Sequence, residues 1–149
     1  MQSSTRTLRV ESLKLVLLCI DDEEFLLECY KEFLQDFGFE VLTASSGRKG
    51  LELAVSSPVD LVLLDYEMPE LDGLQVAAEL RRIRPGTPII LLSGVVDIPA
   101  QMLGLVDGFV PKGDMASRLV PAIVELIGDI RTLSQAVPPA RPATKRECA

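Results

Sequence analysis

The sequence contains no histidine and no tryptophan, and aromatic residues make up only 5% of its 149 residues. Without histidine, the chain lacks the side chain that most often serves as a general base near neutral pH. Its three cysteines, Cys19, Cys29 and Cys148, show no metal-ligand spacing, and their odd number gives no disulfide framework. Any chemistry must therefore use carboxylates, hydroxyls or lysine, and we expect a reducing, cytoplasmic location.

Long apolar runs and excess positive charge are missing as well. No apolar run approaches the roughly 20 residues that span a bilayer, and residues 1–12 lack the apolar core of a signal peptide. The net charge of −7 argues against a nucleic-acid-binding surface. The basic cluster Arg81, Arg82 and Arg84 is expected to be the solvated end of a helix, with a docking surface as the alternative. We therefore predict no direct contact with nucleic acid and no membrane association.

Apolar runs alternate with amphipathic segments along the central part of the chain. The expected strands are residues 15–20, 39–44, 59–64 and 88–93, with a brief fifth strand within 107–114. The expected helices are residues 22–38, 48–57, 73–84, a short one at most within 97–105, and 115–133. This alternation predicts an α/β domain of three layers with a doubly wound, five-stranded parallel sheet. We expect it to span residues 14–133, after a flexible leader (1–13) and before a disordered tail (134–149).

Single residues predict where helices begin and end. The acids after the first strand suit a helix N-terminus, and Gly38 suits the C-terminal cap of the helix that they begin. Pro121 lies inside the final helical segment, where it predicts either a kink or a later helix start.

The expected strands end in polar or charged residues. Asp21 and Asp22 follow the first strand, Asp65 the third, Ser93 the fourth and Lys112 the fifth. The binding crevice of an open parallel sheet lies beyond the carboxyl ends of its strands, so we expect these side chains to converge. Taken singly, each has a simpler interpretation: helix capping for Asp21 and Asp22, a turn for Ser93, and the surface for Lys112.

Three carboxylates close together repel one another unless a cation neutralises them. Mg²⁺ is the usual cation where carboxylates and phosphate share a site, and Mn²⁺ can replace it. We therefore expect Asp65 to face a cation and a wet pocket rather than the buried interior. Asp65 could then act as an oxygen nucleophile towards a phosphoryl group, whose other oxygens Lys112 and Ser93 would bind.

Four motifs, DDEEF, DLVLLDYEMPELDG, PIILLSG and GFVPKGD, resemble those of the receiver domain of two-component response regulators. The resemblance implies a flavodoxin-like fold with strand order 2-1-3-4-5. It also implies Mg²⁺-dependent transfer of a phosphoryl group to Asp65 from a sensor histidine kinase or a histidine phosphotransfer protein. Output would be phosphorylation-dependent binding of a downstream protein, or a phosphorelay. No output domain follows, so we expect a stand-alone signalling domain rather than a turnover enzyme.

The resemblance also implies a role for each site residue. Asp65 matches the phospho-acceptor, Asp22 the direct metal ligand and Asp21 the acid that holds the metal through water. Glu67 falls where the family lends a backbone carbonyl to the metal.

Three further positions match the family's switch. Ser93 matches the switch hydroxyl, Lys112 the phosphate-binding lysine, and Phe109 the aromatic residue that turns inward. Gly113 stands where the family usually has a proline after the lysine, whereas Pro111 precedes it and could follow a cis bond. The segment before Phe109 is also shorter than usual.

Two other functions remain as alternatives. A haloacid-dehalogenase-like phosphatase also forms an aspartyl phosphate, but it wants an aspartate where this chain has Glu67. A receiver-like module for docking or dimerisation, independent of phosphorylation, is favoured by the short segment before Phe109. The three acids and Lys112 argue against it.

Overall fold

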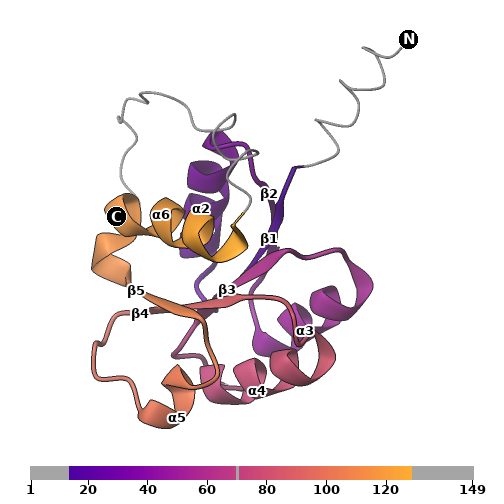
Figure 1. Cartoon of the computed structure of the whole chain (residues 1–149), viewed down its shortest axis with the longest axis vertical. Helices are drawn as coiled ribbons and strands as arrows, with labels where there is room; N and C mark the ends of the chain where they lie inside the picture. The colour runs from indigo at the N-terminus through magenta and orange to yellow at the C-terminus, as the bar shows by residue number, and fades with distance from the viewer. Residues whose placement is uncertain (1–13, 70, 129–149) are drawn as a thin grey trace.

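The computed structural model describes residues 14–69 and 71–128. The predicted leader, the tail and residues 129–133 of the predicted domain lie outside this part. Five parallel strands form one sheet in the order β2-β1-β3-β4-β5 (Figure 1). The predicted fold class and strand order are therefore confirmed.

The elements alternate along the chain as the apolar pattern predicts. The strands are β1 (Val16–Ile20), β2 (Glu40–Ala44), β3 (Leu61–Asp65), β4 (Ile89–Ser93) and β5 (Gly108–Pro111). The helices are α2 (Glu24–Asp36), α3 (Gly47–Ser56), α4 (Gly73–Ile83), α5 (Ala100–Leu103), the 3₁₀ turn η1 (Lys112–Asp114) and α6 (Met115–Ile127). Helices α2 and α6 cover one face of the sheet, and α3, α4 and α5 cover the other (Figure 1). In the described part of the chain, no helix has the length and apolar character needed to cross a bilayer.

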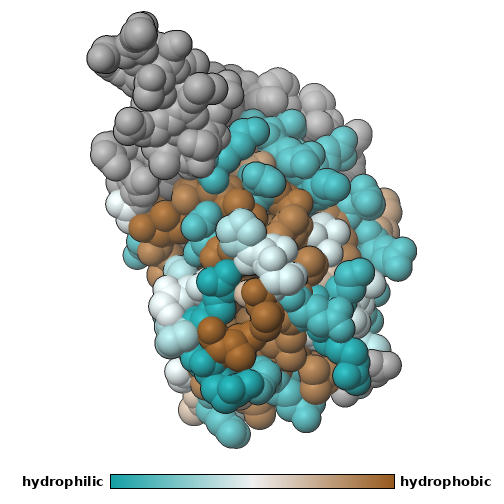
Figure 2. Space-filling view, turned by 90° about the vertical axis from the view of Figure 1, so that its right-hand side faces the viewer, coloured by the Kyte–Doolittle hydropathy of each residue, from teal (hydrophilic) through white to brown (hydrophobic). Residues whose placement is uncertain are grey.

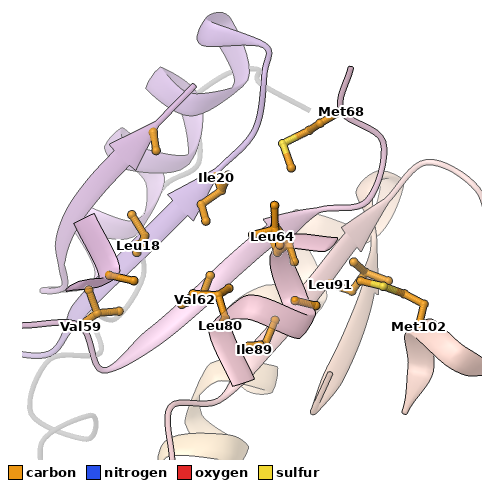
Figure 3. Close-up of a cluster of buried hydrophobic side chains, with 14 of the residues drawn as sticks. Leu18, Ile20, Val59, Val62, Leu64, Met68, Leu80, Ile89, Leu91 and Met102 are labelled. Carbon is orange, nitrogen blue, oxygen red and sulfur yellow. The ribbon is translucent and has the colours of Figure 1, made fainter. Parts of the chain in front are cut away.

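The central strands are buried on both faces, as continuous apolar runs predict. In β1, Leu17 and Cys19 pack under α2 and α6, whereas Leu18 and Ile20 pack on the opposite face of the sheet. Figure 3 shows the apolar cluster on this opposite face of the sheet, in which side chains of β1, β3 and β4 meet Leu80 of α4. Each buried leucine or isoleucine contributes about 1.5–3 kcal/mol, so the core holds the strand ends in fixed positions.

The outer surface of the helical layer is mixed in character. Figure 2 views the molecule from the side on which β2 and α3 lie, and it shows apolar residues interrupted by hydrophilic ones. Val55 of α3 is among the large apolar side chains that stay exposed, at 71% of its surface.

Local signals set several helix ends. Gly38 follows α2 with a φ of 94°, in the left-handed region that glycine adopts readily, and its N–H donates to Gln35. Ser46 caps α3 by accepting the N–H of Lys49. The turn after β3 ends in a capping box, in which Asp72 and Gln75 satisfy each other's backbone N–H groups.

Of the two alternatives that Pro121 predicts, a kink or a later start of the final helix, the later start is excluded. Helix α6 begins at Met115 and continues through Pro121 to Ile127. Leu119 and Ile123, on either side of the proline, are fully buried. Their packing outweighs the backbone hydrogen bond that proline removes. The Val110–Pro111 bond is trans, since no peptide bond in the described residues is cis.

The expectation of a solvated basic helix end is wrong for two of the three arginines. Arg81 donates from Nε to the carbonyl of Leu105 at 2.9 Å and pairs with Asp107. Arg84 donates to the carbonyls of Ala54 and Ser57 at 2.9 and 2.8 Å. A guanidinium offers several donors in a rigid fork, which suits carbonyl groups at helix and strand ends. Of the three, only Arg82 lies exposed, where it bridges to Glu79. Arg81 and Arg84 therefore fasten α4 to neighbouring segments of the chain.

Candidate functional site

The carboxyl ends of β1 and β3 bring three acids together. The two strands pair in parallel with Ile20 opposite Leu64, so the residues that follow them, Asp21 and Asp65, lie side by side. Asp22 joins them, and each acid offers an oxygen within 4.8 Å of the others. The structure thus places the three predicted acids in one cluster.

Lys112 reaches this cluster from the turn after β5. Its Nζ lies 2.9 Å from Oδ1 of Asp65 and 3.3 Å from Oδ2 of Asp21. The side chain of Lys112 is 26% exposed, so it is largely enclosed by the surrounding residues. The alternative of an ordinary surface lysine is excluded by these contacts. Replacement of the family's proline by Gly113 leaves Lys112 within reach of Asp65.

Asp21 is the most enclosed of the three acids, with no exposed surface. Its Oδ1 accepts the N–H of Glu23 at 2.9 Å, and its Oδ2 accepts the hydroxyl of Tyr30 at 3.2 Å. The bond to Glu23 shapes the turn into α2, so Asp21 organises the local backbone as well as joining the cluster. Asp22, by contrast, is exposed and borders the cluster on its solvent side.

The expectation that Asp65 faces a wet pocket is wrong, because only 2% of the residue is exposed. The pKa of its carboxyl group is raised to about 6, chiefly because the group is buried. The hydrogen bond from Lys112 acts to lower this pKa, and the charge of Asp21 acts to raise it. Burial lowers the pKa of Lys112, but its bond to Asp65 and the charges of both acids raise it overall. Lys112 therefore stays cationic, and Asp65 is a carboxylate whose negative charge is only partly compensated.

The donor set of the cluster fits a hard divalent cation. Three carboxylates face one ammonium group, which leaves two negative charges when all three acids are ionised. Oxygen donors of this kind are those that Mg²⁺ and Mn²⁺ prefer. Because Asp22 is exposed, an ion in solvent can reach the cluster at this residue. The cluster is therefore suited to a metal ion.

Ser93 and Phe109 lie on the neighbouring strands. Ser93 ends β4, where its Oγ donates to the carbonyl of Val95 at 2.9 Å and accepts the N–H of the same residue at 3.0 Å. Asp65 pairs with Leu92, so Ser93 follows directly beside the acidic cluster, with its hydroxyl engaged by its own loop. Phe109 is half-buried in β5 and packs on the α3, α4 and α5 side of the sheet.

Glu67 lies outside the cluster. It is exposed two residues after Asp65 and borders a shallow hollow, lined by Tyr66, Glu67, Met68, Pro69, Asp72 and Leu74. Gly73 closes this turn: a Cβ at that position would lie 2.9 Å from the backbone of Tyr66. The absence of a side chain there lets α4 begin directly against the end of β3.

Sequence reasoning missed Tyr30 as part of the site. Its place in the helical apolar pattern explains its burial but gives no hint of its hydroxyl bond to Asp21. One available signal was its type: a tyrosine on a buried helix face needs a hydrogen-bond partner, and Asp21 ends the adjacent strand.

Comparisons with known proteins agree with this geometry. A family model described as the response regulator receiver domain matches residues 17–123. The transcriptional regulatory protein GlrR of Escherichia coli K12 is 41% identical over 83 residues, which cover 56% of this chain and 19% of that protein. The response regulator MprA of Mycolicibacterium vanbaalenii is 32% identical over 126 residues, which cover 83% of this chain and 52% of that protein. The chain thus spans between a fifth and about half of the length of these relatives.

Solved structures give the same result. The crystal structure of the response regulator protein TrrA from Thermotoga maritima, in complex with Mg²⁺-BeF, matches with a TM-score of 0.72 and 34% identity. The match covers 75% of this chain and 98% of that one. A response regulator receiver domain protein from Clostridium thermocellum matches with a TM-score of 0.71 and 31% identity, over 80% of this chain and 98% of that one.

Proposed function

The chain belongs to the response regulator receiver domain family, and from this premise we propose that it accepts a phosphoryl group on Asp65. The donor would be a phosphohistidine on a sensor histidine kinase or a histidine phosphotransfer protein. The observation that carries the proposal is the contact of 2.9 Å between Lys112 Nζ and a buried Asp65 that lies among two further acids.

In the proposed transfer, an oxygen of Asp65 attacks phosphorus, a P–O bond forms, and the P–N bond to the donor imidazole breaks. The imidazole nitrogen keeps the electron pair of the broken bond. Lys112 neutralises charge on a phosphoryl oxygen as the transfer proceeds. Ser93 would exchange its contacts with Val95 for another phosphoryl oxygen, and Phe109 would follow that movement inward.

Mg²⁺ would neutralise charge across the carboxylates and a phosphoryl oxygen. Asp22 and Asp65 would hold the ion directly through their carboxylates, and the backbone carbonyl of Glu67 would be a further ligand. Both oxygens of Asp21 already accept hydrogen bonds, which favours its acting through water. Mn²⁺ would substitute, because it accepts the same oxygen donors.

The proposed output is a change in protein binding, or transfer of the phosphoryl group onward in a phosphorelay. We propose that the domain acts in the cytoplasm as a signalling module, not as a turnover enzyme. The net charge of −7 favours protein partners over nucleic acid.

Incubation with Mg²⁺ and acetyl phosphate, followed by intact-mass measurement, tests the proposal. We expect one labile phosphoryl group on the wild-type protein and none on Asp65→Asn. The exposed Asp36→Asn variant in α2 is the control, and it should be phosphorylated like wild type. Release of many phosphates per molecule would support the phosphatase alternative instead. Lack of uptake from both acetyl phosphate and a phosphohistidine donor would support the docking module.

A further inference from the structure

Tyr30 connects helix α2 to the acidic cluster. The ring is buried, and its hydroxyl donates to Oδ2 of Asp21 at 3.2 Å. The same oxygen lies 3.3 Å from Nζ of Lys112, while Oδ1 accepts the N–H of Glu23. The fully buried carboxylate of Asp21 therefore has three donors: two from α2 and its N-cap, and one from the turn after β5.

The ammonium group of Lys112 is shared between two carboxylates. It lies 2.9 Å from Asp65 and 3.3 Å from Asp21. A buried carboxylate needs hydrogen-bond donors, and loss of one donor strengthens its attraction for those that remain. The hydrogen bond from the hydroxyl of Tyr30 thus weakens the attraction of the Asp21 carboxylate for the ammonium group of Lys112.

The phenol of Tyr30 is fixed in its role as a donor. Burial raises its pKa, and the negative charge of Asp21 raises it further. The hydrogen bond therefore runs from the hydroxyl of Tyr30 to the carboxylate of Asp21.

We propose that Tyr30 is a positioning residue of the phosphorylation site: its hydroxyl holds Asp21 in place and thereby keeps Lys112 directed to Asp65. This inference rests on the proposed function, because it concerns how the same cluster receives a metal ion and a phosphoryl group. Removal of the hydroxyl lets Asp21 draw Lys112 away from Asp65 and lets the Asp21 carboxylate rotate. Partners that orient metal-binding groups in this way typically change metal affinity about 10- to 100-fold when they are lost.

Calorimetric titration with Mg²⁺, without any phosphodonor, tests the proposal. We expect Tyr30→Phe to bind Mg²⁺ about tenfold more weakly than wild type, at the low end of the range for such partners. Tyr66→Phe also removes a phenol hydroxyl, from the residue that follows Asp65, and should bind like wild type. Circular dichroism would establish that each variant is folded.

A double-mutant cycle separates positioning from a merely structural role. If Tyr30 acts through Asp21, adding Tyr30→Phe to Asp21→Asn should cause no further loss of Mg²⁺ affinity. An additive loss would overturn the proposal, as would wild-type affinity in Tyr30→Phe; the proposed function would survive both results. Failure of the wild-type protein to bind Mg²⁺ would overturn the proposed function and this inference with it.

A spectroscopic measurement keeps the test decisive if Tyr30→Phe does not fold. The chain has two tyrosines and no tryptophan, so Tyr30 is the sole fluorophore of its kind in Tyr66→Phe. Its emission should change saturably with Mg²⁺, with the midpoint found by calorimetry. An emission that stays constant while calorimetry shows binding would overturn the role of Tyr30.

Discussion

Replacing Asp65 with asparagine should stabilise the metal-free protein, and the gain should grow with pH. Burial raises the pKa of the Asp65 carboxyl group from 3.8 to about 6 in the folded protein, despite the bond from Lys112. A carboxyl group with a raised pKa favours folding at low pH, below the pKa of the unfolded chain. That contribution is lost as pH rises through the pKa of the folded state. Asparagine does not titrate, so the variant escapes this loss.

The size of the effect follows from the two pKa values. Their difference of about 2 units corresponds to at most about 3 kcal/mol in the free energy of unfolding. Linkage gives a loss of about 1.5 kcal/mol at about pH 5 and about 3 kcal/mol at about pH 8. The stability of Asp65→Asn relative to wild type should therefore increase by about 1.5 kcal/mol between these two pH values. Any pH-independent effect of the amide cancels in this comparison.

Urea unfolding in EDTA, followed by circular dichroism at both pH values, measures this difference. The exposed Asp36→Asn variant is the control, and its stability relative to wild type should be the same at both pH values. If the free energy of unfolding of Asp65→Asn relative to wild type stays constant or falls as the pH rises, the pKa of Asp65 is not raised in the folded protein and the reasoning is refuted. Mg²⁺ should offset most of the advantage at about pH 8, because ligand at about 100 times its Kd stabilises the wild-type fold by about 2.7 kcal/mol.

Three further variants test other parts of the structure. Lys112→Ala should still bind Mg²⁺ in calorimetry but should not show the phosphorylation-dependent change in NMR spectra; normal switching would contradict the role of Lys112. Gly73→Ala should destabilise the fold by about 1–3 kcal/mol in urea unfolding, because the added Cβ would lie 2.9 Å from backbone atoms of Tyr66. Gly86→Ala is the control and should not destabilise the fold in this way, because its Cβ would meet no other atom within 4 Å. Arg84→Ala should lower the free energy of unfolding by about 1–3 kcal/mol because two carbonyls lose their donor, and Arg82→Ala should lower it by less than about 1 kcal/mol. Equal effects of the two arginine variants would contradict the fastening role of Arg84.

The fold was predictable because its signals are local and repeated. Continuous apolar runs marked β1, β3 and β4, and the spacing of apolar residues marked the longer helices. The start of β3 was placed two residues early, since Val59 continues the apolar pattern but the strand begins at Leu61. There the carboxylate of Asp60 accepts the N–H of Val16, an arrangement set by a strand far away in sequence.

The candidate site was predictable in its members more than in its contacts. The ends of parallel strands must lie at one edge of the sheet, so residue type and position predicted where Asp65 and Lys112 would meet. Burial of Asp65 was not predictable, because it depends on how the side chain of Lys112 and the turns around it close over the strand end. The bonds made by Tyr30 and Arg84 were missed for a similar reason: their partners are determined by helix packing, which periodicity alone does not describe.

The acids that form the cluster lie on strands that are far apart in the chain, and they approach one another only when β1 and β3 are in register. An ensemble in which these strands are still separate offers no shared binding place for a divalent ion. The ion should therefore act late along the folding pathway, after the transition state, and should slow unfolding while leaving the refolding rate unchanged. For such a molecule, magnesium would set how long the native state persists rather than how quickly it is reached.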